Sequence, residues 1–408
     1  MKSKLIYIAT RKFLGDFDWK RYEFNFLNKY LDIEIHDLMD FVHPGISKMY
    51  EHIPEIKELK KFDNYNTWKK YILNTRSTFQ GKIYIIIPDS YSFKTLLIRI
   101  FLRKLNVELV EMSVPSKPLY KNNKKFYNVN YIKKIIYFFN KIIFRPKHFF
   151  ASLKSFFFLL VSDYVFKIYV NHKLISDLES YLKQKKKINT NLVSYNSYDY
   201  SHYIIFNKKI NNKIVYPYAV FLSDGGPQFP SDSTFHNTKR VENKKKWFLL
   251  LNDFFSKIES YFNVKVIIAS HPRASRSKYA EYLNNRLSFY NSTLNLVKYS
   301  KFVINMASTS VSYAIMYKKP ILFFYSNQQS KSIATVVNNI FYSNILNSKS
   351  INISKFYDAK ILKNAMCVTS SRYDYFKKNY LSSIYKTTPN YLIFLKKVVN
   401  LKGNQIQN

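Results

Sequence analysis

Short apolar runs alternate with longer amphipathic segments along most of this chain. In the first half, residues 5–9, 31–35, 82–87 and 107–112 have the length and apolar content of buried strands, and residues 19–30 and 92–105 have the periodicity of helices. In the second half, the strand-like runs are 214–222, 264–269, 302–305 and 321–325, and helices are predicted at 247–261, 294–299 and 308–317. Strands that alternate with helices form parallel sheets covered on both faces. The sequence therefore predicts an α/β fold with two Rossmann-like, doubly wound domains.

The length and the single cysteine limit the organisation further. A chain of 408 residues is long enough for two cores of about 200 residues each. The polar stretch at 207–213 separates the two series, so the predicted domains are residues 1–212 and 213–408. Cys367 stands alone, which excludes an intramolecular disulfide and a cysteine-cluster metal site and favours a reducing compartment. The apolar run at the start is too short for a signal peptide, so we expect a cytoplasmic protein.

The charge of the chain is strongly positive. Lys and Arg number 65 against 26 Asp and Glu, for a formal net charge of +39. Such an excess indicates a polyanionic neighbour, which is nucleic acid, anionic lipid or a negatively charged substrate. Abundant Lys, Asn, Ile, Tyr and Phe with only 6 Gly are also typical of AT-rich coding, so part of the charge need carry no function. No known RNA- or DNA-binding module accompanies it, so we expect no nucleic-acid partner.

Residues 121–187 combine this charge with aromatic side chains. The segment holds fifteen Lys or Arg and three acidic residues, and its longest apolar stretch, 156–161, is far below the roughly 20 residues that span a bilayer. One interpretation is an insert that lies in the headgroup region of an anionic membrane, which would place the protein peripherally on the inner face of the cytoplasmic membrane. The other is a buried helical hairpin with lysines that reach out to water.

Polar motifs follow three of the predicted strands in the second half. Asp224 precedes Gly225 and Gly226, which permit a left-handed backbone and close approach of a substrate, although an aspartate before glycine is most often a turn residue. His271 follows the next strand, and Pro272 restricts it to an extended backbone. Arg273 can hold a phosphate or carboxylate in a bidentate grip. Ligands bind at the carboxyl ends of strands in such sheets, so these loops are candidates for one site.

The third motif is a run of hydroxyls, Ser308, Thr309 and Ser310, where a helix is expected to begin. Free N–H groups and hydroxyls at a helix start can bind a phosphate. Simple capping is the alternative, but one hydroxyl would be enough for a cap.

In this order, the three motifs resemble those of bacterial sialyltransferases and related nonulosonic-acid and Kdo transferases of surface-polysaccharide biosynthesis. Asp224-Gly225, His271-Pro272 and Ser308-Thr309 occupy the motif positions, and the similarity covers residues 218–324. The first motif of that family usually carries two acids, whereas Ser223 precedes Asp224 here.

The resemblance implies a GT-B glycosyltransferase that needs no metal and no cofactor. It implies an acceptor-side domain at 1–212 and a nucleotide-sugar domain at 213–408 whose tail crosses back. Asp224 would be the general base and His271 a catalytic group on the leaving phosphate, while Gly225, Gly226, Arg273, Ser308, Thr309 and Ser310 would bind substrate. Asp199 is the next candidate base. The donor would be a CMP-activated 2-keto sugar acid of sialic, legionaminic, pseudaminic or Kdo type, and the acceptor a saccharide or glycolipid.

Two other functions are compatible with the sequence. CDP-polyol phosphotransferases of the teichoic-acid type resemble the same His-Pro-Arg and Ser-Thr-Ser pattern. A non-catalytic scaffold at the membrane surface of a polysaccharide assembly complex is the third possibility.

Overall fold

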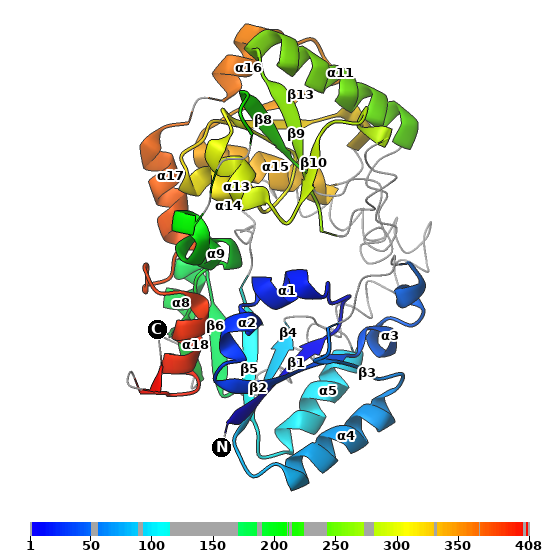
Figure 1. The fold of residues 1–408 in the computed structure, drawn as a ribbon, viewed down its shortest axis with the longest axis vertical. Coiled ribbons are helices and arrows are strands. Elements are labelled where there is room, and N and C mark those ends of the chain that lie inside the picture. The colour runs from blue at the N-terminus through cyan, green and yellow to red at the C-terminus, as the bar shows by residue number, and fades with distance from the viewer. Residues whose placement is uncertain are drawn as a thin grey trace, which may run out of the picture.

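The computed structural model describes most of the chain outside a long segment in the first half. The described residues are 2–49, 56–88, 93–114, 170–185, 190–209, 211, 214–223, 243–272, 281–329, 333–366, 368–402 and 405–406. They form two α/β units, each built on one parallel sheet (Figure 1).

The first sheet has seven strands in the order β3-β2-β1-β4-β5-β6-β7. They are β1 (Ser3–Ala9), β2 (Leu31–Asp37), β3 (Leu59–Lys61), β4 (Ile83–Pro88), β5 (Glu108–Ser113), β6 (His172–Ile175) and β7 (Asn191–Ser194). All neighbours pair in parallel, as in the register Ser3 to Leu31 between β1 and β2. The chain starts in the middle of the sheet, moves outward to β3 and then crosses to β4.

The second sheet has six strands and repeats this order as β10-β9-β8-β11-β12-β13. The strands are β8 (Tyr218–Leu222), β9 (Lys265–Ser270), β10 (Ser288–Tyr290), β11 (Val303–Asn305), β12 (Ile321–Tyr325) and β13 (Ser350–Asn352). The two orders confirm the predicted class: α/β with two Rossmann-like, doubly wound domains, the architecture of GT-B enzymes.

Helices cover both faces of the first sheet. One face packs under α3 (Met39–Val42), α4 (Tyr65–Thr78) and α5 (Phe93–Arg103), and the other under α1 (Asp16–Arg21), α2 (Phe24–Leu27), α9 (Tyr198–Phe206) and α18 (Asn390–Lys397). Residues 172–185 of the predicted basic insert are part of the first domain, because they form β6 in the sheet and helix α8 (Leu178–Lys185), which joins β6 to β7. Residues 121–169 of that insert lie outside the described residues.

The second sheet is covered in the same way. Helices α11 (Lys244–Phe262) and α16 (Ala359–Ala365) pack on one face. Helices α13 (Thr293–Tyr299), α14 (Val311–Met316), α15 (Ile333–Leu346) and α17 (Ser370–Phe376) pack on the other. Because both faces are buried, the strands are apolar along their length, as in the Val266, Ile267 and Ile268 run of β9.

The chain returns to the first domain after α17. A π-helical turn, η6 (Lys377–Leu381), leads to α18, whose Ile393, Phe394 and Leu395 are buried in the core of the first domain. Asn390 exchanges two hydrogen bonds with the backbone of Asn196, at 2.9 and 3.0 Å. The C-terminal helix therefore ties the end of the chain to the N-terminal sheet (Figure 1). Among the described residues, no helix is both long enough and apolar enough to cross a bilayer.

Candidate functional site

The point where the second sheet reverses its winding lies between β8 and β11. The chain leaves β8 toward β9 on one side and later re-enters at β11 on the other, so the loops after these two strands diverge. Such a reversal opens a crevice at the carboxyl ends of the strands, where ligands of doubly wound folds bind. Leu222 of β8 pairs with Ala269 of β9 and with Asn305 of β11, so the three strands end at nearly the same level.

The three predicted motifs start at these three neighbouring strand ends. His271 directly follows β9, and Ser308 comes three residues after the end of β11. Asp224 follows Ser223, the residue after β8, but Asp224, Gly225 and Gly226 lie outside the described residues, as does Arg273. The described part of the structure thus brings the starts of the loops together, and the positions of Asp224 and Arg273 stay predictions.

The hydroxyl run after β11 does little capping. Asn305 Oδ1 accepts the N–H of Ser308 at 3.1 Å, and Ser308 Oγ accepts the N–H of Ser310 at a long 3.4 Å. Ser310 is the N-cap of α14 and makes no side-chain capping bond. Ser308, Thr309 and Ser310 are half-buried. Among the described residues, only the Ser308 hydroxyl accepts an N–H at the helix start, and that bond is long, which favours the interpretation as a ligand-binding loop over simple capping.

Two buried polar atoms mark the same edge of the sheet. Asn305 is fully buried and Ser270 is 3% exposed. Within the described ranges, Asn305 Nδ2 and Ser270 Oγ have no hydrogen-bond partner. Because buried polar groups are almost always paired, these atoms indicate that a polar partner belongs at the ends of β9 and β11. Both can donate a hydrogen bond, which suits the oxygens of a phosphate or a sugar.

Asp199 lies behind this loop and joins the two domains. It is on α9, and its carboxylate accepts a hydrogen bond from the hydroxyl of Ser312 on α14. The Ser312 hydroxyl also lies 2.8 Å from the carbonyl of Thr309. Burial raises the pKa of Asp199, while the charge of Arg21 and the hydroxyls of Ser312 and Tyr313 oppose that rise. Asp199 is therefore placed to hold α14, rather than to meet an acceptor as the alternative base.

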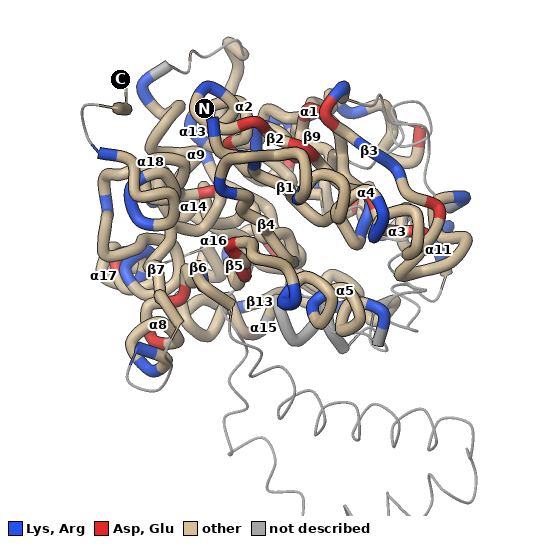
Figure 2. Tube along the Cα trace, turned by 90° about the horizontal axis from the view of Figure 1, so that it is seen from below, with Lys and Arg blue, Asp and Glu red and all other residues tan. Residues whose placement is uncertain are grey.

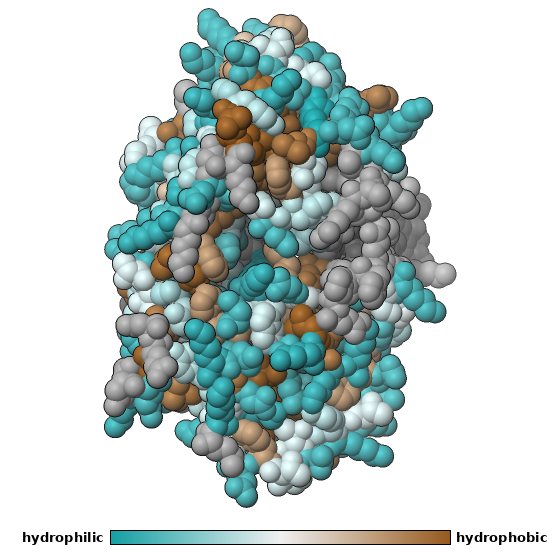
Figure 3. All heavy atoms as spheres, viewed as in Figure 1, coloured by the Kyte–Doolittle hydropathy of each residue, from teal (hydrophilic) through white to brown (hydrophobic). Residues whose placement is uncertain are grey.

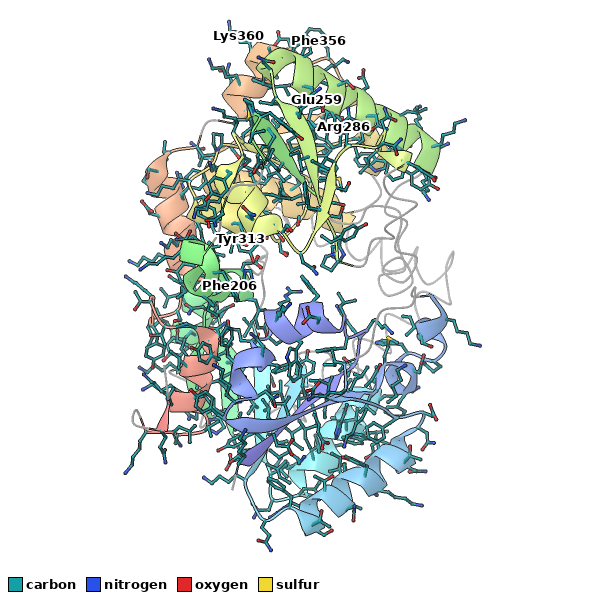
Figure 4. All side chains as sticks on the ribbon, in the orientation of Figure 1. Phe206, Glu259, Arg286, Tyr313, Phe356 and Lys360 are labelled. Carbon is teal, nitrogen blue, oxygen red and sulfur yellow. The ribbon has the colours of Figure 1, made fainter. Side chains whose placement is uncertain are left out.

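The contact continues through aromatic side chains. Tyr313 Oη lies 3.2 Å from Nδ1 of His202, whose ring packs 4.6 Å from that of Phe206. Figure 4 shows Tyr313 and Phe206 on either side of the junction between the domains. Burial lowers the pKa of His202 to about 4, so this histidine is neutral at neutral pH. The rings of His202, Phe206 and Tyr313 thus form a packed part of the junction in which the histidine carries no charge.

Sequence reasoning did not single out Asn305 or Ser270 as site residues. Each is a polar residue at the end of an otherwise apolar strand, and that contrast is the signal that marks them. Within the described residues, no group of three or more His, Cys, Asp or Glu side chains could hold a metal ion.

Solved structures of similar fold include enzymes of nucleotide-sugar chemistry. The calicheamicin glycosyltransferase CalG4 aligns over 95% of this chain and 96% of its own, at 8% identity and a TM-score of 0.48. A Methanocaldococcus jannaschii UDP-GlcNAc 2-epimerase, solved with UDP-GlcNAc and UDP, aligns over 93% and 99%, at 10% identity and a TM-score of 0.42. WaaG, a glycosyltransferase involved in lipopolysaccharide biosynthesis, aligns over 98% and 100%, at 11% identity and a TM-score of 0.39. Identities this low describe the fold alone. No protein-family model and no curated protein sequence matches the chain.

Proposed function

We propose that this protein is an inverting, metal-independent glycosyltransferase of surface-polysaccharide biosynthesis. It transfers a 2-keto sugar acid from a CMP-activated donor to a saccharide or glycolipid acceptor. The observation that supports the proposal is that the three motifs follow β8, β9 and β11, which are neighbouring strands at the switch point of the second sheet. The CMP donor assignment rests on the resemblance of the motifs.

The proposed roles follow from the chemistry of the transfer. An acceptor hydroxyl attacks the anomeric carbon, the bond from that carbon to the phosphate oxygen breaks, and CMP leaves with the bonding electron pair. Asp224 accepts the hydroxyl proton, which makes the acceptor oxygen a stronger nucleophile. Attack on the face opposite the leaving group inverts the anomeric configuration.

The leaving phosphate gains negative charge and needs donors that are already in place. His271 and the hydroxyls of Ser308, Thr309 and Ser310 supply hydrogen bonds, and Arg273 supplies a fixed charge. Gly225 and Gly226 let the backbone approach the donor closely. The buried Asn305 Nδ2 and Ser270 Oγ are further donors at the same edge. These groups would stabilise the departing phosphate without a metal ion.

Nucleotide release tests the proposal. The full chain is incubated separately with a CMP-activated 2-keto sugar acid, a CDP-polyol and UDP-GlcNAc, and the freed nucleotide is measured. Release of CMP from the CMP-sugar alone is the expected result. CMP from the CDP-polyol would instead identify a phosphotransferase of the teichoic-acid type, and UDP release would overturn the CMP donor. No release from any donor, with and without oligosaccharide acceptors, would favour a non-catalytic scaffold.

A further inference from the structure

A buried asparagine, Asn339 of α15, links the ends of two strands beside the candidate site. The ladder between β11 and β12 ends at the pair Asn305 and Phe323. One residue further along each strand, the carbonyls of Met306 and Phe324 both accept hydrogen bonds from Nδ2 of Asn339, the first at 2.7 Å. Asn339 therefore ties both strand ends to α15 at the point where the backbone pairing stops.

The carboxamide of Asn339 is held in one orientation. Its Nδ2 has two hydrogens and donates to the two carbonyls, and its Oδ1 accepts the hydroxyl of Ser350, the first residue of β13, at 2.6 Å. A flipped amide would turn Oδ1 toward two carbonyl oxygens, which cannot donate. Asn339 is fully buried. A buried amide is costly unless it is bonded, and a fully bonded one fixes a single local geometry.

The strand end that Asn339 holds leads directly into the hydroxyl run. Met306 comes two residues before Ser308. The same segment is held at two further points, since Asn305 Oδ1 accepts the N–H of Ser308 at 3.1 Å and the hydroxyl of Ser312 lies 2.8 Å from the carbonyl of Thr309. All three bonds are made to backbone groups of residues 306–309. The loop is thus fixed through its backbone before a ligand arrives, which lowers the ordering cost of binding.

We propose that Asn339 is a positioning residue for substrate binding. By holding the carbonyl of Met306, it sets the position of Ser308, Thr309 and Ser310 against the phosphate of the nucleotide. The inference rests on the proposed function for the identity of this ligand. Because Asn339 is fully buried, it acts through the loop and does not touch the ligand itself. Loss of its amide should therefore weaken nucleotide binding although every group that contacts the nucleotide is kept.

Asn339→Ala tests the inference, and Asn252→Ala is the matched control. Asn252 of α11 is also a buried asparagine of the second domain. Its Nδ2 donates to the carbonyl of Tyr282 at 2.9 Å, and its Oδ1 accepts from Arg286 at 2.9 Å. Both partners precede β10, at the opposite end of that strand from the carboxyl edge of the sheet. The two variants delete the same atoms, and both should lower the midpoint of thermal unfolding.

The loop should respond to Asn339→Ala and not to Asn252→Ala. Calorimetry with CMP should give a dissociation constant at least about tenfold larger than that of wild type for Asn339→Ala, and one within about twofold for Asn252→Ala. Hydrogen exchange of the full chain, followed by mass spectrometry without any ligand, should be faster in peptides that cover residues 306–313 of Asn339→Ala. Asn252→Ala should leave the exchange of these peptides as in wild type.

Ser350→Ala is a milder variant that serves if Asn339→Ala does not fold. It removes one bond, the one that orients the Asn339 amide, so it should shift CMP affinity and loop exchange in the same direction by a smaller factor. Ser288→Ala is its control, because Ser288 is the first residue of the other edge strand, β10, and its hydroxyl bonds to the carbonyl of Arg286.

Wild-type CMP affinity in Asn339→Ala, or in Ser350→Ala if that is the variant that folds, would overturn the inference. Equal changes in the Asn252 or Ser288 control would do the same. The exchange measurement separates this inference from the proposed function. If wild type binds no CMP, the proposed donor is contradicted, and faster exchange of residues 306–313 still supports the role of Asn339. CMP binding by wild type with unchanged loop exchange in the variants would contradict this inference alone.

Discussion

Two residues at the ends of β8 and β9 divide the chemistry of the proposed transfer. Asp224 is assigned the acceptor proton, which moves only as the bond forms, whereas His271 is assigned the phosphate, which is present before and during the reaction. The two roles differ in their effect on binding, since a group that contacts the ground state also contributes to affinity.

Substitution of these residues should separate the two roles. Asp224→Ala is expected to lower turnover by about 10² or more with CMP affinity nearly unchanged, because general-base catalysis acts in the transition state. His271→Ala should lower turnover and also weaken CMP binding. Turnover is measured by CMP release in the presence of acceptor, and affinity by calorimetry.

Asp253→Ala removes an exposed acid of α11 and serves as the control that should change neither quantity. A near wild-type rate in Asp224→Ala would exclude it as the base. Loss of CMP binding in that variant would instead make Asp224 a turn residue that shapes the Gly225 and Gly226 loop.

The sequence located the candidate site through residue order, and the structure adds what order cannot show. The βαβ pattern predicted that each motif follows a strand, and the structure shows that β8, β9 and β11 are neighbours. The order of residues alone could not identify Asn305 and Ser270 as site residues. They stand out only in the structure, where Asn305 Nδ2 and Ser270 Oγ are buried and have no hydrogen-bond partner among the described residues. The role of Asp199 was also hidden, since Ser312 lies 113 residues away in the chain.

At the scale of helices and strands, α9 and α14 form the direct contact between the domains next to the hydroxyl run. Asp199 is a buried residue, 9% exposed, and the hydroxyls of Ser312 and Tyr313 donate hydrogen bonds to its carboxylate. A buried carboxylate that loses a donor becomes costly, because no water replaces the bond.

Ser312→Ala should therefore loosen this contact. We expect the free energy of unfolding to fall by about 1–3 kcal/mol, the usual effect of leaving a buried acceptor without one donor. The midpoint of thermal unfolding measures the change, and Ser371→Ala, an exposed hydroxyl on α17, is the control. CMP affinity should fall as well, because α14 continues directly from the 308–310 loop. Equal unfolding midpoints in the two variants would show that the contact contributes nothing to stability.

The prediction of whole elements succeeded where they are long and apolar. Strands β1, β2, β4, β5, β8, β9, β11 and β12 lie at the predicted runs. The strands β3, β10 and β13 were missed, because three residues at a sheet edge show no apolar periodicity. The strands β6 and β7 were missed as well: each has only four residues, and β6 lies within the segment interpreted as a basic insert. The sequence predicted one continuous helix at 19–30, which is wrong. The structure has two helices there, because Glu23 adopts a left-handed backbone with φ of 61°: α1 ends at Arg21 and α2 begins at Phe24.

At the scale of the molecule, positive charge is spread over both domains with fewer acids between (Figure 2). The face seen in Figure 3 is mostly hydrophilic, with apolar patches most visible on the second, upper domain. Positive charge spread over the whole molecule attracts any anionic surface. A specific membrane contact by residues 121–187 must therefore be distinguished from this general attraction.

Liposome flotation can make that distinction. If residues 121–187 bind membranes, replacing Lys133, Lys134 and Lys141 by Gln should weaken binding to anionic vesicles at least about tenfold, since each lysine near such a surface contributes roughly 1 kcal/mol. Replacing Lys244, Lys245 and Lys246, exposed at the start of α11, removes the same charge elsewhere. Equal loss in both variants would indicate general attraction, and flotation indifferent to anionic lipid would exclude the membrane contact.

Glu23 lies where the two ends of the chain meet. Its Oε2 accepts the N–H of Tyr391 from α18 at 2.7 Å, and the hydroxyl of Ser201 from α9 also bonds to its carboxylate. The side chain is 3% exposed, and burial raises the pKa of Glu23 to about 7 despite these two bonds. No charged group acts on it among the described residues.

A raised pKa makes the folded state hold a proton that the unfolded chain has already lost. The stability of wild type should therefore decrease as pH rises from about 4.5 to about 7, by at most about 3 kcal/mol from this group, and change little above that range. Glu23→Gln keeps an acceptor for Tyr391 and cannot ionise, so its unfolding midpoint should exceed that of wild type at pH 8 and approach it at pH 5. Denaturant unfolding of both proteins across this range measures the difference. The contrary result is that the free energies of unfolding of the two proteins differ by the same amount at pH 5 and pH 8. That result would show that Glu23 is already ionised in the folded protein at pH 5, and that the junction of α2, α9 and α18 tolerates the charge.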